Sequence, residues 1–61
     1  MTDFRLQWFD EDRQLWVQQH NWVSEKGYCY RQYDLSDGTS DKVRRISEAD
    51  FISAYEELLD V

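Results

Sequence analysis

The chain has 61 residues, of which 13 are acidic and seven are Lys or Arg, so its formal net charge is −6 at pH 7. This acidic balance disfavours direct binding to nucleic acid or to an anionic membrane surface, because such binding depends on Lys and Arg neutralising phosphates. The single cysteine, Cys29, excludes an internal disulfide and fits a reducing cytoplasm. The aromatic-rich, proline-free composition indicates one small folded domain over residues 1–61.

No targeting or membrane-spanning segment is recognisable. The first residues, MTDFRLQ, lack the basic region and the apolar run of a signal peptide, and no apolar stretch approaches the roughly 20 residues of a membrane span. We therefore expect a soluble, cytoplasmic protein without membrane contact.

Four segments show the residue patterns of β-strands. Residues 3–9 alternate between two side-chain faces, and residues 14–20 do the same. Residues 28–35 are rich in aromatic side chains that favour a pleated surface. The short basic segment 42–46 is compatible with an edge strand, but the sequence leaves open whether it forms. The connections are short and polar, which favours an antiparallel meander.

Residues 48–60 are predicted to form a helix. Ser47 and Asp50 have the spacing of a capping box, and Ile46 and Phe51 that of a hydrophobic staple. A stripe of apolar side chains at helical spacing would pack against one face of the sheet, because a lone helix of this length is marginal in water. The sequence therefore predicts an α+β fold, a small two-layer domain with the order β-β-β-(β)-α.

The polar side of this helix is unusually acidic. Residues 48–61 contain five acids and no base, and several of these acids lie at the negative end of the helix dipole. No Lys or Arg stands four residues from any of them within the helix. Helix stability does not explain this arrangement, whereas solubility or a cationic partner would. The candidate partner-binding acids are Asp50, Glu56, Glu57 and Asp60.

One helix covers only one face of a sheet, so some of the ten aromatic side chains should be exposed. If Phe4, Trp8 and Val17 lie beneath the helix, Trp16 lies on the opposite, open face. Placing the small Cys29 in the core would leave its two tyrosine neighbours outside, although the sequence does not decide which face Cys29 takes. The candidate aromatic binding residues are Trp16, Trp22, Tyr28 and Tyr30.

Catalytic chemistry is not indicated. His20 and Cys29 are the only residues of their types, and no nucleophile motif surrounds either. The acids of residues 10–12 lack the spacing of a calcium loop, and no glycine-rich phosphate loop exists. We expect a protein that is not an enzyme, with no catalytic residue, no cofactor and no metal ion.

These observations favour a protein-binding module that inhibits or modulates a basic, nucleic-acid-handling protein. Between residues 48 and 60 the helix rises about 18 Å. Five carboxylates over that length give one per ~3.6 Å, near the ~3.4 Å spacing of phosphates along a DNA strand. Small acidic nucleic-acid mimics of phage and mobile-element anti-defence systems offer a class-level analogy. The alternatives are a structural module that forms a homodimer through its aromatic sheet face, and an aromatic-lined peptide or glycan binder.

Overall fold

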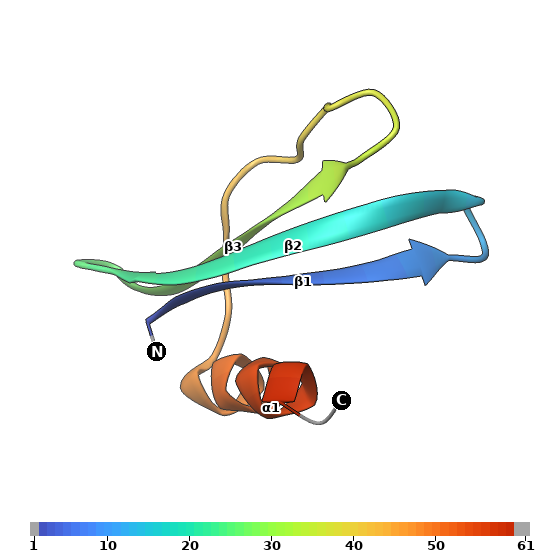
Figure 1. Cartoon of the computed structure of the whole chain (residues 1–61). Helices are drawn as coiled ribbons and strands as arrows, with labels where there is room; N and C mark the ends of the chain where they lie inside the picture. Colours follow the sequence, from blue (N-terminus) through green and yellow to red (C-terminus); the bar gives the residue numbers. More distant parts are fainter. Residues whose placement is uncertain (1, 60–61) are drawn as a thin grey trace.

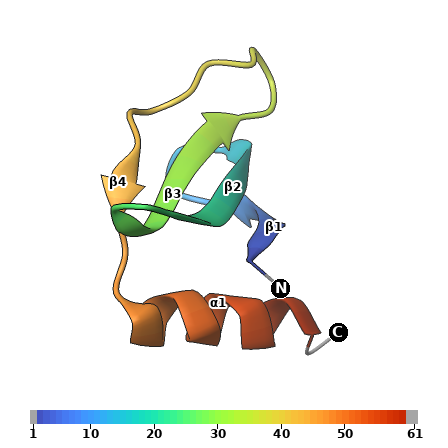
Figure 2. The ribbon, with the colours of Figure 1, turned by 90° about the vertical axis from the view of Figure 1, so that its left-hand side faces the viewer.

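The computed structural model describes residues 2–59, which form one antiparallel sheet followed by one helix (Figure 1). The elements are β1 (Asp3–Asp10), β2 (Leu15–Ser24), β3 (Gly27–Asp34), β4 (Arg44–Arg45) and α1 (Glu48–Leu59). The strands lie in the sheet in the order of the sequence, and α1 forms a second layer on one side of it (Figure 2). The predicted α+β meander with a C-terminal helix is confirmed.

Several strand boundaries differ from the prediction. β2 continues to Ser24 instead of ending near residue 20, because a tight turn places Ser24 directly opposite Gly27. The Ser24 hydroxyl accepts a hydrogen bond from the backbone N–H of Lys26 (3.1 Å), and Gly27 adopts a left-handed φ of 111°. The fourth strand forms, but only as Arg44–Arg45 and not over residues 42–46.

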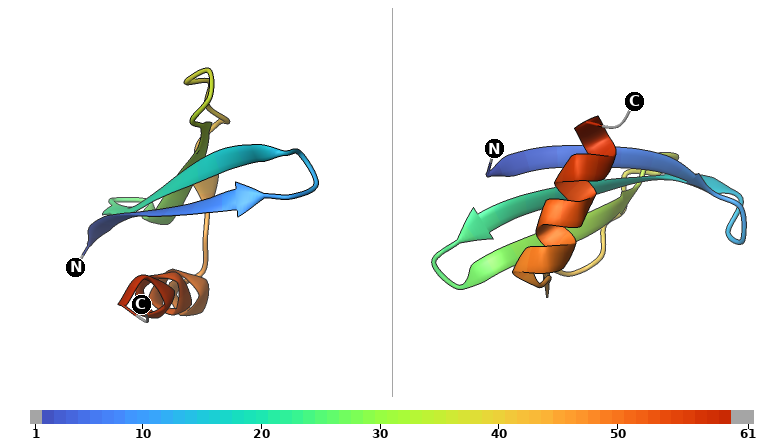
Figure 3. Two further views of the ribbon diagram at one scale, coloured as in Figure 1. Left: turned by 45° about the vertical axis from the view of Figure 1, so that its right-hand side comes forward. Right: turned by 90° about the horizontal axis from the view of Figure 1, so that it is seen from below.

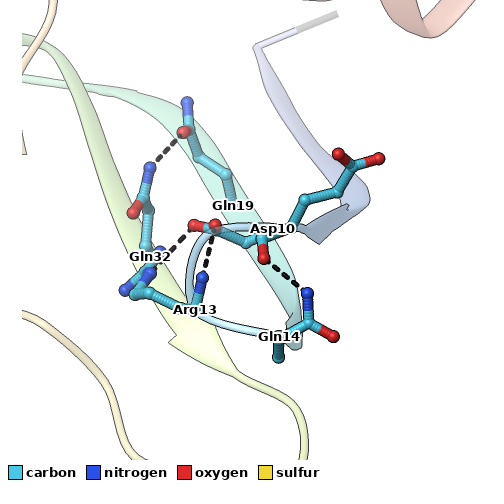
Figure 4. Close-up of polar contacts among 6 residues, drawn as sticks. Asp10, Arg13, Gln14, Gln19 and Gln32 are labelled. Atoms are coloured by element: carbon cyan, nitrogen blue, oxygen red, sulfur yellow. Dashed lines mark hydrogen bonds and ion pairs between the residues drawn. The ribbon is translucent and has the colours of Figure 1, made fainter.

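The hairpin between β1 and β2 is held by side-chain contacts to the loop backbone (Figure 4). Asp10 accepts hydrogen bonds from the backbone N–H of Arg13 (3.1 Å) and from its Nε (2.8 Å). Gln14 then adopts a φ of 57°, and its Nε2 donates to the carbonyl oxygen of Glu11 (2.6 Å). A residue other than glycine therefore closes this loop in the left-handed region.

The register assigns each side chain to a face of the sheet. Phe4 lies opposite Asn21, and Asn21 in turn lies opposite Tyr30, so all three share one face. Helix α1 packs on this face: the Phe4 and Phe51 ring centroids are 5.1 Å apart, and those of Tyr28 and Phe51 are 4.8 Å apart. We call it the helix face and the other the open face.

The grouping of Tyr28 and Tyr30 with Trp16 and Trp22 on one aromatic face is wrong. The two-residue turn that follows Ser24 sets Tyr28 opposite Val23 and Cys29 opposite Trp22. Both tyrosines therefore point to the helix face, and Cys29 points to the open face. Cys29 is nevertheless buried, with its Sγ 3.5 Å from the Ser24 hydroxyl.

Helix α1 begins as predicted, because the Ser47 hydroxyl accepts a hydrogen bond from the backbone N–H of Asp50 (3.1 Å). From there the helix runs beneath β3 and β2 toward β1, and its last turn projects past the edge of β1 (Figures 2 and 3). The helix ends at Leu59, so the predicted Asp60 lies outside the described residues. Within residues 2–59, no helix has the length and apolar character needed to cross a membrane.

Candidate protein-binding site

The predicted acids of α1 are available to a partner. Asp50, Glu56 and Glu57 are all exposed. Among residues 2–59, the ion pair between Asp10 and Arg13 and the hydrogen bond between His20 and Asp3 both lie elsewhere. The helix therefore presents negative charge that the described part of the chain does not neutralise. The fourth predicted acid, Asp60, is outside that part.

These acids do not form one continuous row. Asp50 and Glu57 are seven residues apart, which is close to two helical turns, so their side chains lie on the same side of α1. Both line a groove between the helix and the sheet, whereas Glu56 lies farther around the helix and does not line it. The structure brings two of the predicted acids together and places the third on the outer surface.

The groove combines apolar side chains from both layers with two acids on its helix side. It has a volume of about 740 Å³ and opens to solvent. The residues that line it from the sheet are Leu6, Gln7, Trp8 and Gln19, and those from the helix side are Ile46, Asp50, Ser53, Ala54, Glu57 and Leu58. Apolar contact area with a few polar groups is the usual composition of a binding groove. Sequence reasoning identified the acids of this groove but not the groove itself.

A row of amide side chains lies on the helix face beside the groove. Gln32 donates to Oε1 of Gln19 (3.0 Å), as Figure 4 shows, and Gln19 donates to Oδ1 of Asn21 (2.9 Å). Asn21 is completely buried, and its Nδ2 has no hydrogen-bond partner among the described residues. The sequence contains a sign of this row, because Gln19 and Asn21 lie two and four residues from the core residue Val17 on β2 and therefore share its face.

The open face bears a different surface. Trp16 is 51% exposed and its ring meets that of Phe9 edge-on, with the centroids 5.6 Å apart. Leu35 is exposed beside them and helps to line a shallow depression of about 460 Å³. Phe9 and Leu35 were not among the predicted site residues. Phe9 could have been found, because it alternates along β1 with Arg5 and Gln7 and therefore lies on the open face. We call Phe9, Trp16 and Leu35 the open-face patch.

Trp22 belongs to the same face but not to this patch. It is six residues from Trp16 on one strand, about 20 Å away. Its ring stacks on His20 with the centroids 4.9 Å apart, and His20 Nε2 lies 2.7 Å from a carboxylate oxygen of Asp3. The four predicted aromatic residues are therefore distributed over three places: the open-face patch, the His20 stack and the helix face.

Two carboxyl groups have a lowered pKa, and hydrogen bonds explain both shifts. Hydrogen bonds from the backbone and side chain of Arg13 lower the pKa of Asp10, and hydrogen bonds from Thr39 lower the pKa of Asp37. Cys29 contacts Ser24 and the carbonyl oxygen of Gly27, whereas His20 contacts Asp3 and Trp22. In the described range, no three His, Cys, Asp or Glu side chains converge as metal ligands would.

No family model, no curated protein and no solved structure matches this chain. Its function is therefore inferred from its own surfaces.

Proposed function

We propose that this protein is a cytoplasmic, non-enzymatic binding module that inhibits or modulates a basic protein through the acidic side of α1. Asp50, Glu56 and Glu57 make the electrostatic contacts, with Asp60 as a fourth candidate. The observation that supports the proposal best is that Asp50, Glu56 and Glu57 are exposed and have no positive partner within residues 2–59.

The position of these acids strengthens the proposal. Glu56 and Glu57 lie in the last turn of α1, which contains no basic residue. Negative charge at this end opposes the helix dipole and costs on the order of 0.3–1 kcal/mol per residue at low salt. Surface acids that lower the stability of the helix are better explained by binding to an external partner than by a role in folding.

The expected class of partner is a nucleic-acid-handling protein. Such proteins bind phosphates through clusters of Lys and Arg, and these clusters also attract an acidic helix by long-range steering. The chain as a whole is acidic, with a net charge of −6, so the attraction extends beyond the helix. In this proposal the helix occupies the phosphate-binding surface of its partner and thereby competes with nucleic acid.

The test compares two variants of equal charge. One neutralises the helix acids (Asp50→Asn, Glu56→Gln, Glu57→Gln). The control neutralises three exposed acids in turns (Glu11→Gln, Asp12→Asn, Glu25→Gln). The side chains of these three acids form no hydrogen bond or ion pair among the described residues. Each immobilised protein is presented to a lysate of the native host. A partner retained by the wild type and the control, lost by the helix variant and displaced by duplex DNA is the expected result.

Salt dependence gives the second measure. Affinity for the captured partner should fall steeply between about 50 and 500 mM salt, because exposed charges more than a few ångströms apart are screened at high ionic strength. If the helix variant binds as well as the control, or if salt has almost no effect, the acidic side of α1 is not the binding surface.

The open-face patch supports a second candidate function, a homo-oligomeric structural module. Phe9 and Trp16 are 41% and 51% exposed and already pack against each other, which is the kind of aromatic cluster that anchors interfaces. Sedimentation equilibrium distinguishes this candidate. A dimer that Trp16→Arg converts to a monomer would support it, and a monomeric wild type at high concentration would eliminate it.

A further inference from the structure

Strand β1 leaves one of its edges unpaired within the sheet. The strand order places β1 at the border, where β2 is its only neighbour among residues 2–59. The carbonyl oxygen of Thr2 accepts from the N–H of Val23 (3.1 Å), so even-numbered residues of β1 direct their backbone groups toward β2. By the same alternation Arg5, Gln7 and Phe9 direct their N–H and C=O groups away from the sheet.

This edge has few of the features that normally prevent strand pairing. β1 is eight residues long, contains no proline and pairs with β2 in a continuous register without a bulge. Its one basic residue, Arg5, donates to Oε1 of Gln18 (2.9 Å) on the neighbouring strand. The opposite edge, β4, is by contrast only two residues long, and both residues are arginine.

Helix α1 extends over the space beside this edge. Its last turn projects past β1, as the view from below shows (Figure 3). The groove follows the helix to this edge, where Leu6 and Trp8 of β1 line it from the sheet and Glu57 and Leu58 line it from the helix. A strand added to β1 would lie about 4.8 Å farther out, under the last turn of the helix. Its side chains on the helix face would enter the groove.

We propose that β1 accepts an extended segment of the basic partner as a fifth strand, with Lys or Arg side chains directed under the last turn of α1 toward Glu57. This inference rests on the proposed function and specifies how the partner binds. Main-chain hydrogen bonds to Arg5, Gln7 and Phe9 hold the segment, and Glu57 selects its charge. Strand addition with side-chain pockets on one face is a recurrent mode of peptide recognition.

A second copy of the chain fits this edge less well. Antiparallel pairing of two β1 strands requires a two-fold axis perpendicular to the sheet, which puts both helices on the same face. The two overhanging last turns would then approach each other, and each bears Glu56 and Glu57 without a basic residue. Each chain has a net charge of −6, so repulsion opposes this pairing and favours a basic occupant.

The probe is an eight-residue capped peptide of alternating Arg and Val. Its first control replaces Arg by Glu, and its second keeps Arg and Val but is N-methylated at the four central residues, which blocks both edges of the peptide backbone. Two protein variants complete the design. Gln7→Pro removes an N–H that points away from the sheet, which an edge strand tolerates, and Gln7→Ala removes the side chain but keeps the N–H.

The expected result is that the wild type binds the Arg-Val peptide, and that Gln7→Ala, which keeps the N–H, binds it more tightly than Gln7→Pro does. Gln7→Pro should weaken binding by about tenfold or more, and N-methylation should do the same, because each removes backbone hydrogen bonds. The Glu-Val peptide should not bind measurably. Circular dichroism checks that Gln7→Pro is folded, and the N-methylated peptide provides the decisive comparison if it is not.

The outcomes separate this inference from the proposed function. If N-methylation and Gln7→Pro have no effect but Asp50→Asn with Glu57→Gln weakens binding, the fifth strand is wrong and the acidic surface stands. If those acid substitutions also have no effect, both proposals fail. If sedimentation shows a dimer that Gln7→Pro dissociates, the occupant is a second copy, and the inference is overturned.

Discussion

The ring of Phe4, near the start of the first strand, meets the ring of Phe51 in the helix edge-on, with the centroids 5.1 Å apart and the planes at 69°. The same helix residue also packs on Tyr28 of β3, and Tyr55 packs on Phe4. Phe51 is the only residue of α1 that is buried. The helix is therefore attached to the sheet through a small aromatic cluster near the N-terminal end of β1, and the groove occupies the remaining space between the two layers.

Phe51 should be the most sensitive core position. Truncating a buried phenylalanine costs about 3–5 kcal/mol, which approaches the whole stability expected of a domain this small. We expect Phe51→Ala to abolish cooperative urea unfolding at 25 °C, and Phe51→Leu, which keeps most of the apolar volume, to retain it at a lower midpoint. Tryptophan fluorescence and circular dichroism record both transitions. A Phe51→Ala protein that loses less than about 1 kcal/mol would show that the aromatic cluster does not hold the layers together.

The thiol of Cys29 should be protected although it faces the side without a helix. Cys29 is only 6% exposed, and Arg45, its cross-strand neighbour, reaches over to donate to the carbonyl oxygen of Lys26 (2.8 Å). We expect slow reaction with a thiol reagent under native conditions and a faster reaction in Arg45→Ala. Lys42→Ala, in the preceding loop, is the control and should leave the rate unchanged. Equal rates for both variants would mean that Arg45 does not shield the thiol.

The hairpin loop should make stability depend on pH in the acid range. Hydrogen bonds from Arg13 hold the pKa of Asp10 below its ordinary value of 3.8 in the folded state. A group with a lowered folded-state pKa stabilises the fold above the unfolded value, and this contribution is lost as the pH falls through the folded value. Asp10→Asn should therefore be less stable than the wild type at pH 7, and the difference should shrink below pH 4. A difference in unfolding midpoint that stays constant down to pH 2 would contradict this assignment.

The left-handed conformation of Gln14 predicts which replacements the loop accepts. At a φ of 57°, a β-branched side chain is strained, whereas asparagine is tolerated. We expect Gln14→Val to lower the free energy of unfolding by about 1 kcal/mol and Gln14→Asn to leave it nearly unchanged. Urea titration of the two variants measures the contrast. The reverse order would show that the Gln14 hydrogen bond to Glu11 matters more than the backbone conformation.

The sequence predicts the elements better than their relation to one another. The start of α1 follows from the Ser47 cap, and the exposure of Trp16 follows from its parity on β2. The face of Cys29 does not follow, because it depends on how many residues the turn after Ser24 contains. One residue more or fewer in that turn would move Cys29 to the helix face and Tyr28 to the open face.

The groove and the free edge of β1 are harder to predict from the sequence. The exposed edge of β1 depends on the strand order, and the overhang of α1 depends on the direction in which the helix crosses the sheet. Neither is a property of a local pattern. The charges of Asp50 and Glu57 are plain in the sequence, but their position beside Leu6 and Trp8 arises only when strand and helix are packed.

The most direct test of the proposed binding surface is a residue-resolved NMR titration of the ¹⁵N-labelled protein with its captured basic partner. The proposal predicts that amide shifts gather on Asp50, Ser53, Glu57 and the facing residues of β1. Shifts confined to Trp16, Leu35 and their neighbours on the open face, with α1 unchanged, would contradict it.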